Sequence, residues 1–207
     1  MSEFDWSTLL RSWEIELIEL LNQIERLDLI EFEALELEAI RKQRLGNTPG
    51  PCDAIGELEA RLGYSLSPSI TSFFNFTAEW ILPGIGKHAA KVLPAEEIDY
   101  FWRKYPAQYS EFESNPREGI SDKRYFQYGA EQDPEVFRTE YARDLVVITT
   151  DSPTSFYFLN GAVRSADGEL EAWYFSFHGG AQRFRTFFEL MKSERYRISR
   201  SYREILD

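Results

Sequence analysis

The sequence predicts an α+β fold, in which helices precede and follow a group of strands. Three observations predict it. Apolar residues recur at every third or fourth position through residues 6–24, which is the spacing of one helix face. Residues 145–178 contain runs of β-branched and aromatic residues separated by turn sequences, which is typical of strands. After Gly180 the apolar residues return to helical spacing.

The first helix is expected to begin after Asp5, because aspartate is a residue type that caps helix N-termini. Its apolar stripe consists of Trp6, Leu9, Leu10, Trp13, Leu17, Leu20, Leu21 and Ile24. An unbroken helix to Leu45 would be roughly 60 Å long at ~1.5 Å per residue, which is long for this chain. We therefore expect a break near Asp28, where Asp28 and Glu31 resemble the capping box of a second helix.

Residues 46–51, Gly-Asn-Thr-Pro-Gly-Pro, are the strongest linker signal in the chain, because two prolines and two glycines cannot continue a helix. The length of 207 residues is enough for one large domain with its own core. We therefore divide the chain into an acidic N-terminal helical extension (1–46), a linker (47–51), a main α+β domain (52–192) and a C-terminal helical tail (193–207).

Helix signals also occur before the strands of the main domain. Asp at a cap and Pro in the first turn both mark helix starts. They predict helices over residues 53–63, from Pro68 through Phe74, from Pro94 to Pro106 and from Asp133 to Arg143. The stretch 106–123 is rich in Ser, Pro, Asn and Gly and is expected to be a long irregular connection.

Two strands are expected at residues 145–150 and 156–159, both rich in β-branched or aromatic residues. The turn sequence at 151–154 separates them, so the two strands should be adjacent. A final helix is expected to start near Phe184 and to continue to Leu206.

Asp167 and Gly168 are typical of a tight hairpin turn between two further extended segments. If the turn has two residues, Arg164 lies opposite Glu171 and the two form an ion pair across the strands.

The chain carries 35 Asp and Glu against 23 Lys and Arg, a net charge of −12 with both histidines neutral. This acidity argues against a general nucleic-acid coat or an anionic-membrane binder. One cysteine and two histidines leave few ligands for a metal centre, so no metal or cofactor is expected. No stretch approaches the ~20 apolar residues of a membrane span, and the first residues are acidic where a signal peptide is basic. These features favour a cytoplasmic protein.

Motifs in both halves of residues 52–192 resemble one known family. Those of the C-terminal half are Leu159-Asn160-Gly161, the run Ser165-Ala166-Asp167-Gly168-Glu169-Leu170-Glu171-Ala172-Trp173, Gly180-Ala181-Gln182-Arg183-Phe184 and Phe187-Phe188-Glu189-Leu190-Met191. Those of the N-terminal half are the helix Ile55–Gly63 with its Leu-Glu step, Leu66-Ser67-Pro68-Ser69, Phe73-Phe74 and Trp80. In this order they resemble the SUKH superfamily, which contains fungal cell-wall-assembly regulators of the Smi/Knr type and many bacterial immunity proteins.

The resemblance implies an α+β domain with a mostly antiparallel sheet flanked by helices, and no known catalytic set. Bacterial members typically neutralise a partner toxin by binding it. We therefore predict a non-enzymatic protein-binding domain, an immunity protein that inhibits a toxin by direct binding. The alternative is an adaptor or scaffold protein in a regulatory or cell-envelope complex, as the fungal members suggest.

Few residues suggest chemistry, and each has a plainer interpretation. Glu169 and Glu171 share one face of a predicted strand and could act as paired acid and base, or could simply line a solvated face. His178 could be a general base or an ordinary turn residue. His88 follows Gly-Ile-Gly-Lys, which lacks the remaining residues of a phosphate loop. Cys52 has no cationic neighbour that would activate its thiol.

Four residues are candidates for contact with a protein partner: Trp80, Trp102, Glu169 and Glu171. The two tryptophans lie outside the clearest periodic segments, so they could form a binding surface or be buried in the core.

Charge is unevenly distributed along the chain. Residues 1–46 carry −6, residues 47–182 carry −9 and residues 183–207 carry +3. The acidic N-terminal helices could attract a basic partner such as a nuclease toxin, or could cover the domain with their acids in solvent. The basic tail could pair with the acids of the protein itself through Arg195, Arg197, Arg200 and Arg203.

Overall fold

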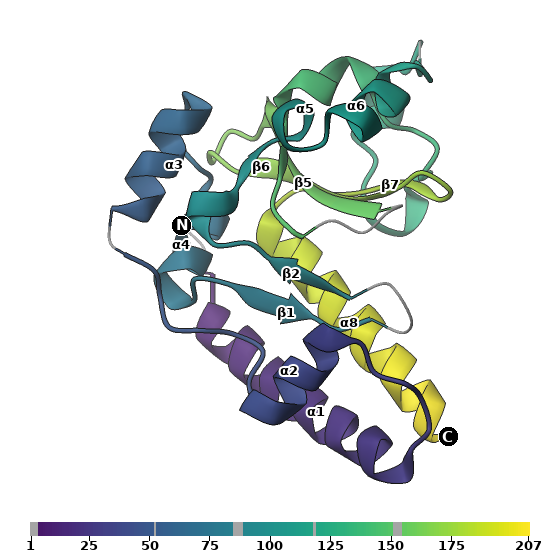
Figure 1. The fold of residues 1–207 in the computed structure, drawn as a ribbon. Coiled ribbons are helices and arrows are strands. Elements are labelled where there is room, and N and C mark those ends of the chain that lie inside the picture. The colour runs from purple at the N-terminus through teal and green to yellow at the C-terminus, as the bar shows by residue number, and fades with distance from the viewer. Residues whose placement is uncertain (1–3, 52, 85–88, 118, 151–154) are drawn as a thin grey trace.

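A five-stranded sheet lies at the centre of the protein (Figure 1). The structure is a computed structural model that describes residues 4–51, 53–84, 89–117, 119–150 and 155–207. The strands, which lie in the sheet in chain order, are β3 (Asp99–Tyr100), β4 (Leu145–Val147), β5 (Ser155–Arg164), β6 (Leu170–Ser176) and β7 (Gly180–Phe184). Every neighbouring pair is antiparallel, so the predicted α+β fold with an antiparallel sheet is confirmed.

Helices cover both faces of this sheet. The first face packs against α1 (Trp6–Leu27), α3 (Ala54–Leu62), α4 (Pro68–Phe76) and α8 (Phe187–Leu206). The second face packs against the short helices α5 (Phe101–Lys104), α6 (Pro106–Glu113), α7 (Asp122–Tyr125) and the 3-10 helix η3 (Thr139–Asp144). Because both faces are covered, β5 is apolar from Phe156 to Leu159: Phe156 and Phe158 point to the second face, and Tyr157 and Leu159 to the first.

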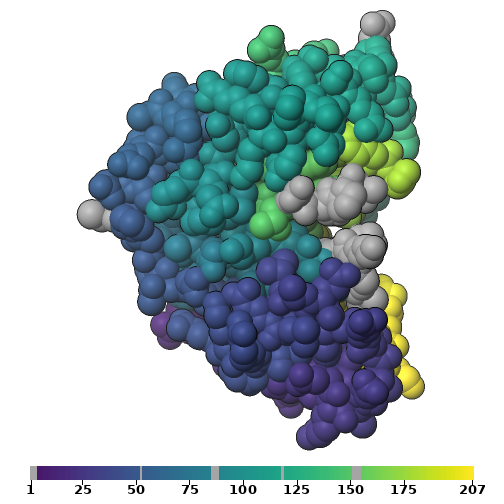
Figure 2. Space-filling model, viewed as in Figure 1, coloured from purple at the N-terminus to yellow at the C-terminus, as the bar shows by residue number. Residues whose placement is uncertain are grey.

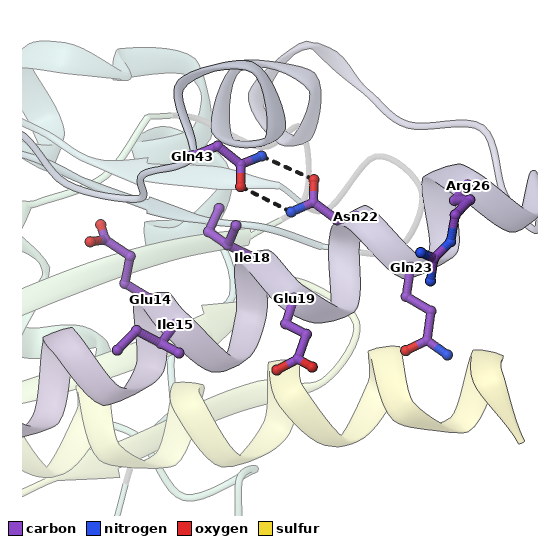
Figure 3. A pocket seen from close by; sticks show the side chains of 8 residues that line it. All are labelled: Glu14, Ile15, Ile18, Glu19, Asn22, Gln23, Arg26 and Gln43. Carbon is purple, nitrogen blue, oxygen red and sulfur yellow. Dashed lines mark hydrogen bonds between the residues drawn. The ribbon is translucent and has the colours of Figure 1, made fainter.

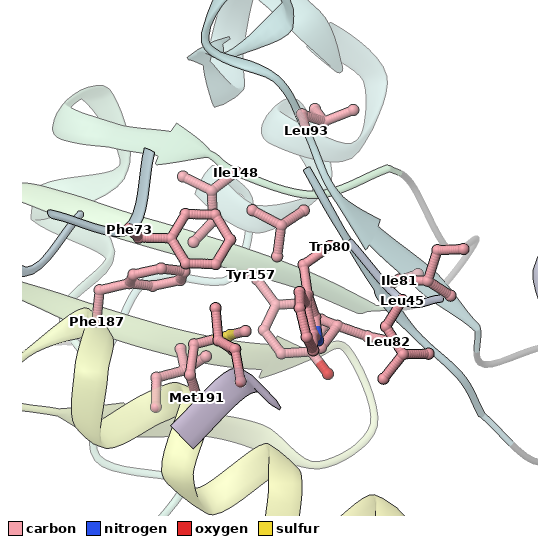
Figure 4. Close-up of a cluster of buried hydrophobic side chains, with 14 of the residues drawn as sticks. Leu45, Phe73, Trp80, Ile81, Leu82, Leu93, Ile148, Tyr157, Phe187 and Met191 are labelled. Atoms are coloured by element: carbon pink, nitrogen blue, oxygen red, sulfur yellow. The ribbon is translucent and has the colours of Figure 1, made fainter. Parts of the chain in front are cut away.

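A separate two-stranded hairpin, β1 (Trp80–Leu82) with β2 (Ala90–Val92), lies beside the first face. Single bridges join it to Gly46 and to Thr149. Figure 4 shows Trp80 of the hairpin in the same buried cluster as Phe73, Tyr157 and Met191. This hairpin was not predicted from the sequence. The remaining elements are α2 (Ala34–Lys42) and the 3-10 helices η1 (Ala95–Glu97) and η2 (Gly129–Glu131).

The N-terminal helix α1 begins and breaks where the sequence predicts. Asp5 caps it through a hydrogen bond from Thr8 N to its Oδ1 at 2.9 Å. The helix ends at Leu27. The prediction that Asp28 begins the second helix as part of a capping box is wrong. Asp28 instead closes α1 in the left-handed conformation, with φ 53°, and α2 begins only at Ala34.

The apolar stripe of α1 belongs to the same hydrophobic cluster as the first face of the sheet. Trp13 packs against Trp80 with ring centroids 5.8 Å apart, and Trp6 donates a hydrogen bond from Nε1 to the carbonyl of Ser69 at 3.0 Å. In Figure 1, α1 and α8 run side by side. The helices of residues 1–46 therefore complete the core of the domain.

Several helix predictions in the middle of the chain were wrong in extent. The stretch 106–123 is not wholly irregular, because α6 starts at Pro106 and buries Phe112 in the second cluster. The helix expected from Pro94 to Pro106 is divided into the 3-10 helix η1, the strand β3 and the short helix α5. The helix expected from Asp133 is a turn followed by η3, which starts at Thr139. In α6 the burial of Phe112 outweighs the Ser, Pro, Asn and Gly content from which an irregular connection was expected.

The hairpin between β5 and β6 has a longer turn than predicted. Gly168 N donates to Ser165 O, Ser165 N donates to Glu169 O, and Gly168 has φ 88°. This is a three-residue loop with glycine in the left-handed position. The loop places Arg164 opposite Leu170, and the irregularity between Asn160 and Arg164 then pairs Asn160 with Glu171. The predicted pair of Arg164 with Glu171 is therefore wrong.

Other predictions are confirmed. β4 and β5 are adjacent, and α8 continues to Leu206. All four arginines of the tail form ion pairs with acids of the chain: Arg195 and Arg203 with Glu16, Arg197 with Glu194, and Arg200 with Glu204. Cys52, His88 with the preceding Gly-Ile-Gly-Lys loop, and the turn at 151–154 lie wholly or mainly outside the described residues. None of the helices in the described ranges is long and apolar enough to cross a membrane.

Candidate functional site

Of the four predicted partner-binding residues, only Trp102 lies at the surface. Trp80, Glu169 and Glu171 are 2%, 2% and 1% exposed, so they offer no area to a partner in this structure. Trp102 is partly exposed, and its ring packs against other side chains of the protein. It stacks on Tyr100, with centroids 6.1 Å apart, and the guanidinium groups of Arg103 and Arg143 lie 4.8 and 5.6 Å from its centre.

Glu171 is the centre of a buried polar cluster on the second face of the sheet. Four side chains donate hydrogen bonds to its carboxylate: Tyr125 Oη at 2.5 Å, Tyr128 Oη at 2.9 Å, Asn160 Nδ2 at 2.9 Å and Trp173 Nε1 at 2.6 Å. Burial raises the pKa of Tyr125 and of Tyr128, and the Glu171 charge raises them further, so both phenols remain protonated donors. A carboxylate that accepts four hydrogen bonds is held as a structural group.

Arg183, on β7, supplies the positive charge of this cluster. It is fully buried, and its Nη1 lies 3.7 Å from Glu171 Oε1 and donates a hydrogen bond to the carbonyl of Tyr125. Its guanidinium also lies 4.4 Å from the centre of the Tyr125 ring. The pairing of Trp173 with Arg183 across β6 and β7 brings it there. The sequence interpretation gave Glu171 the wrong arginine because it had the wrong hairpin register.

Glu169 serves a different purpose on the opposite side of the sheet. It accepts hydrogen bonds from Ser69 N at 2.9 Å and from Ser69 Oγ at 2.5 Å, so it caps the N-terminus of α4. Burial raises its pKa, although the hydrogen bonds from Ser69 act in the other direction. Glu169 precedes β6 and does not share the strand face of Glu171, so the structure does not assemble the two into an acid–base pair.

His178 lies exposed in the turn between β6 and β7. Its imidazole forms no hydrogen bond with any residue in the described part of the chain. Within the same part of the chain, no group of three or more His, Cys, Asp or Glu residues could hold a metal ion.

Two further acids that the sequence did not single out, Glu36 and Glu194, are buried. Glu194 accepts hydrogen bonds from Tyr157 Oη and from Arg197 Nη2, both at 2.6 Å. Glu36 Oε1 accepts from Gly84 N at 3.0 Å and from Tyr202 Oη at 3.4 Å, whereas its Oε2 has no partner among the described residues. The signal for Glu36 was its position three and four residues before Ala39 and Ile40, on the buried face of α2.

Glu36 gives the stability of the protein a pH dependence of predictable sign. Burial raises the pKa of its carboxyl above the ordinary value of 4.5. Above pH 4.5 this carboxyl ionises more readily in the unfolded chain than in the folded protein, so its contribution to stability falls as the pH rises. Glu36→Gln, which cannot ionise, should therefore gain stability relative to the wild type between pH 4 and pH 7 in urea denaturation.

The matched variant Glu38→Gln should show the opposite trend. The hydrogen bond from Lys42 Nζ, at 2.6 Å, lowers the pKa of Glu38, so its ionised form stabilises the fold at neutral pH and loses that effect on acidification. Equal pH profiles for the two variants would contradict the buried position of Glu36.

The surface feature with the clearest binding character lies on the N-terminal arm, by which we mean α1, α2 and the connecting residues 28–33. The arm forms the lower part of the face in Figure 2. Six large apolar side chains are exposed in the described part of the chain, and four lie on this arm: Ile15 (71%), Leu27 (53%), Leu29 (45%) and Leu37 (48%). Exposed apolar side chains that adjoin one another mark interaction surfaces.

A groove of about 530 Å³ runs along the outer face of α1. Its lining from α1 is Glu14, Ile15, Ile18, Glu19, Asn22, Gln23 and Arg26, a spacing of three and four residues that keeps these side chains on one side of the helix. Figure 3 shows Gln43, at the end of α2, above this groove and in two reciprocal hydrogen bonds with Asn22, each of 3.0 Å.

The arm also presents unpaired acids. Glu19, Glu25, Asp28, Glu31 and Glu33 are exposed, and their carboxylates form no ion pair or hydrogen bond to any described residue. The other acids of the arm differ: Glu14 accepts from Leu45 N, Glu16 pairs with two arginines of α8, and Glu38 pairs with Lys42. Four of the five unpaired acids lie at residues 25–33, close in sequence to the exposed Leu27 and Leu29.

No model of a known protein family matches this chain, and no curated protein matches it.

Proposed function

We propose that this chain is a non-enzymatic protein-binding domain that acts in the cytoplasm and neutralises a basic toxin by direct binding. The observation that carries the proposal is the N-terminal arm, which bears four of the six large apolar side chains exposed in the described part of the chain, together with five carboxylates that have no partner among the described residues. Apolar anchors with surrounding charge of one sign suit the recognition of a protein of opposite charge.

The buried acids Glu169 and Glu171 have structural roles, which supports a protein without catalytic function. Glu169 caps a helix, and Glu171 is saturated by four donors and an arginine. The one candidate base in the described chain, His178, lies apart in an exposed turn. Glu169, Glu171 and His178 therefore do not line a common site that a substrate could reach.

The toxin as partner rests on the resemblance of residues 52–192 to the SUKH superfamily and on the acidity of the protein. A net charge of −12 would accelerate association with a basic partner and would repel nucleic acid that competes for it. The partner expected is accordingly a protein with a basic, nucleic-acid-binding surface, such as a nuclease toxin.

Affinity capture with the full chain from the source organism tests this function. The expected result is recovery of one basic protein that is toxic when expressed alone and harmless when expressed with this chain. Recovery of several acidic or neutral host proteins, with no rescue from any of them, would contradict toxin neutralisation and favour an adaptor.

A further inference from the structure

We infer that the cavity between the end of β1, the first face of the sheet and α8 binds a free α-amino acid, whose carboxylate lies at Arg197 and whose ammonium lies at Tyr202. The inference goes beyond the proposed function, because no described residue of the N-terminal arm lines this cavity. Its volume is about 220 Å³, below the roughly 300–1,000 Å³ of sites for drug-sized ligands, so a smaller molecule is expected.

Three parts of the fold form the cavity. Ser155 and Tyr157 lie two residues apart on β5, so they share the first face of the sheet. Tyr157 pairs with Tyr174 of β6, and the two ring centroids are 5.0 Å apart. Pro83 and Gly84 follow β1, whose end lies beside α8 in Figure 1. The lining from α8 is Arg197, Ile198, Ser201 and Tyr202, a spacing that keeps them on one side of the helix.

The donors on one side of the cavity suit a carboxylate. Among the described residues that line it, Arg197 alone is charged. Its Nη2 donates to Glu194 Oε2 at 2.6 Å and its Nε donates to Glu194 Oε1 at 3.2 Å, which orients the guanidinium. Arg197 Nη1 has no hydrogen bond within the described part of the chain, so its N–H groups are available to a ligand. A guanidinium oriented in this way binds carboxylates strongly.

The acceptors on the other side of the cavity suit an ammonium group. Tyr202 Oη donates its proton to Glu36 Oε1 at 3.4 Å, and Tyr157 Oη donates its proton to Glu194 Oε2 at 2.6 Å. Burial raises the pKa of both phenols, and the neighbouring carboxylates raise it further, so the protons stay on the tyrosines. Because each proton is directed at a carboxylate, the phenol oxygens keep lone pairs that can accept hydrogen bonds from a ligand.

The buried carboxylate of Glu36 favours a positive charge in the cavity. Glu36 is 1% exposed, forms no ion pair with any described residue, and its Oε2 has no hydrogen-bond partner among them. Glu36 does not line the cavity, but Gly84 and Tyr202, which do, donate hydrogen bonds to its Oε1. A buried carboxylate without a counter-charge is costly, and an ammonium group at Tyr202 would supply the missing charge.

Together the two sides select a ligand that carries both charges. A ligand with only a carboxylate would lie near the unbalanced charge of Glu36, and one with only an ammonium would lie near the guanidinium of Arg197. Arg197 and Tyr202 are five residues apart on α8, which is about 7.5 Å at ~1.5 Å per residue. An α-amino acid can bridge this separation with a hydrogen bond of about 3 Å at each end. Pro83 and Ile198 give the cavity an apolar wall, so the side chain of the ligand is expected to be apolar.

The test titrates the full chain by isothermal calorimetry with L-alanine, L-valine, L-leucine and L-phenylalanine. At least one of the four should bind saturably, at one site per chain. The tightest of them is then compared with its decarboxylated amine and with its deaminated acid, each of which lacks one charged group. Both analogues should bind at least about tenfold more weakly. In NMR spectra of the ¹⁵N-labelled protein, the amide shifts should gather at residues 155–157 and 197–202.

Two matched pairs of variants locate the two ends of the ligand. Glu36→Gln removes the buried charge and should weaken amino-acid binding at least about tenfold, whereas Glu38→Gln on the same helix should change the affinity less than about twofold. Arg197→Lys keeps a positive charge opposite Glu194 but loses the guanidinium, so it should weaken binding several-fold. Arg200→Lys, at an exposed ion pair of the same helix, should not. Urea denaturation of each variant checks that the fold is intact.

The inference has several ways to fail. Failure of all four amino acids to bind would overturn it, and so would equal binding of either analogue. Amide shifts away from residues 155–157 and 197–202, or equal effects of Glu36→Gln and Glu38→Gln, would also overturn it. Because no described residue of the N-terminal arm lines the cavity, loss of amino-acid binding leaves the capture of a toxin unchanged, and the two proposals fail separately.

Discussion

Glu171→Ala is expected to lower the free energy of unfolding by about 3–5 kcal/mol, because it leaves the buried guanidinium of Arg183 without its counter-charge. Four hydrogen-bond donors lose their acceptor at the same time, among them Trp173 Nε1 and Tyr125 Oη. Each unsatisfied buried donor adds a desolvation cost to the loss of charge balance. Urea denaturation at pH 7 measures the effect.

Two comparisons make this result specific. Glu171→Gln keeps an acceptor oxygen for part of the cluster and should cost less than the alanine variant. Glu131→Ala removes an exposed glutamate and should lie within about 0.5 kcal/mol of the wild type. A loss for Glu171→Ala as small as that for Glu131→Ala would place Glu171 at the surface, contrary to the structure.

Trp13→Ala is expected to cost about 3–5 kcal/mol, the range for removal of a large aromatic side chain from a core. Trp13 has no exposed area and packs against Trp80, so its loss removes contacts between the N-terminal arm and the hairpin β1–β2. Because α1 shares one hydrophobic cluster with the sheet, the whole protein should unfold in a single destabilised transition.

The control for Trp13 is Ile15→Ala, two residues further along the same helix and 71% exposed. It should change stability by no more than about 0.5 kcal/mol. Separate unfolding of residues 1–46, with the transition of the sheet unchanged in Trp13→Ala, would show that the arm is an appendage and not part of the core.

The sequence predicted those parts of the fold in which a local pattern and tertiary burial agree. The stripe from Trp6 to Ile24 repeats the helical period, and the same residues are buried against α8 and the sheet. The ion pairs of Arg195 and Arg203 were also expected, because an acidic chain with a basic last helix offers partners everywhere. The strands expected at 145–150 and 156–159 are neighbours for a similar reason, although β4 ends at Val147 and β5 extends from Ser155 to Arg164.

Prediction failed where one residue decides the geometry. Gly168 adopts φ 88° as the third residue of a loop, which a two-residue interpretation of Asp-Gly does not foresee, and this change of register moved Glu171 away from Arg164. Glu169 and Glu171 were expected at the surface and Trp80 either in a binding surface or in the core, yet all three are buried, the two acids by partners distant in sequence such as Ser69 and Arg183. Such partners have no local signal.

The candidate surface was only half foreseen. The acidity of residues 1–46 indicated a docking face, while the alternative was that their stripe covers the domain. The structure shows that α1 does cover the domain with Trp13 and Leu17, and that its other side carries Ile15 within a groove. Helical periodicity identifies the buried side of a helix, but an isolated exposed isoleucine becomes meaningful only when a groove surrounds it.

Whether the N-terminal arm is the surface that binds the toxin is tested by amide hydrogen exchange. Exchange is measured on the full chain, free and bound to the toxin recovered by affinity capture. Binding should slow exchange on the N-terminal arm, in the last two turns of α1 and in residues 28–33, and should leave α5 and α6 beside Trp102 unchanged. Protection confined to α5 and α6, with the arm exchanging as in the free protein, would contradict it.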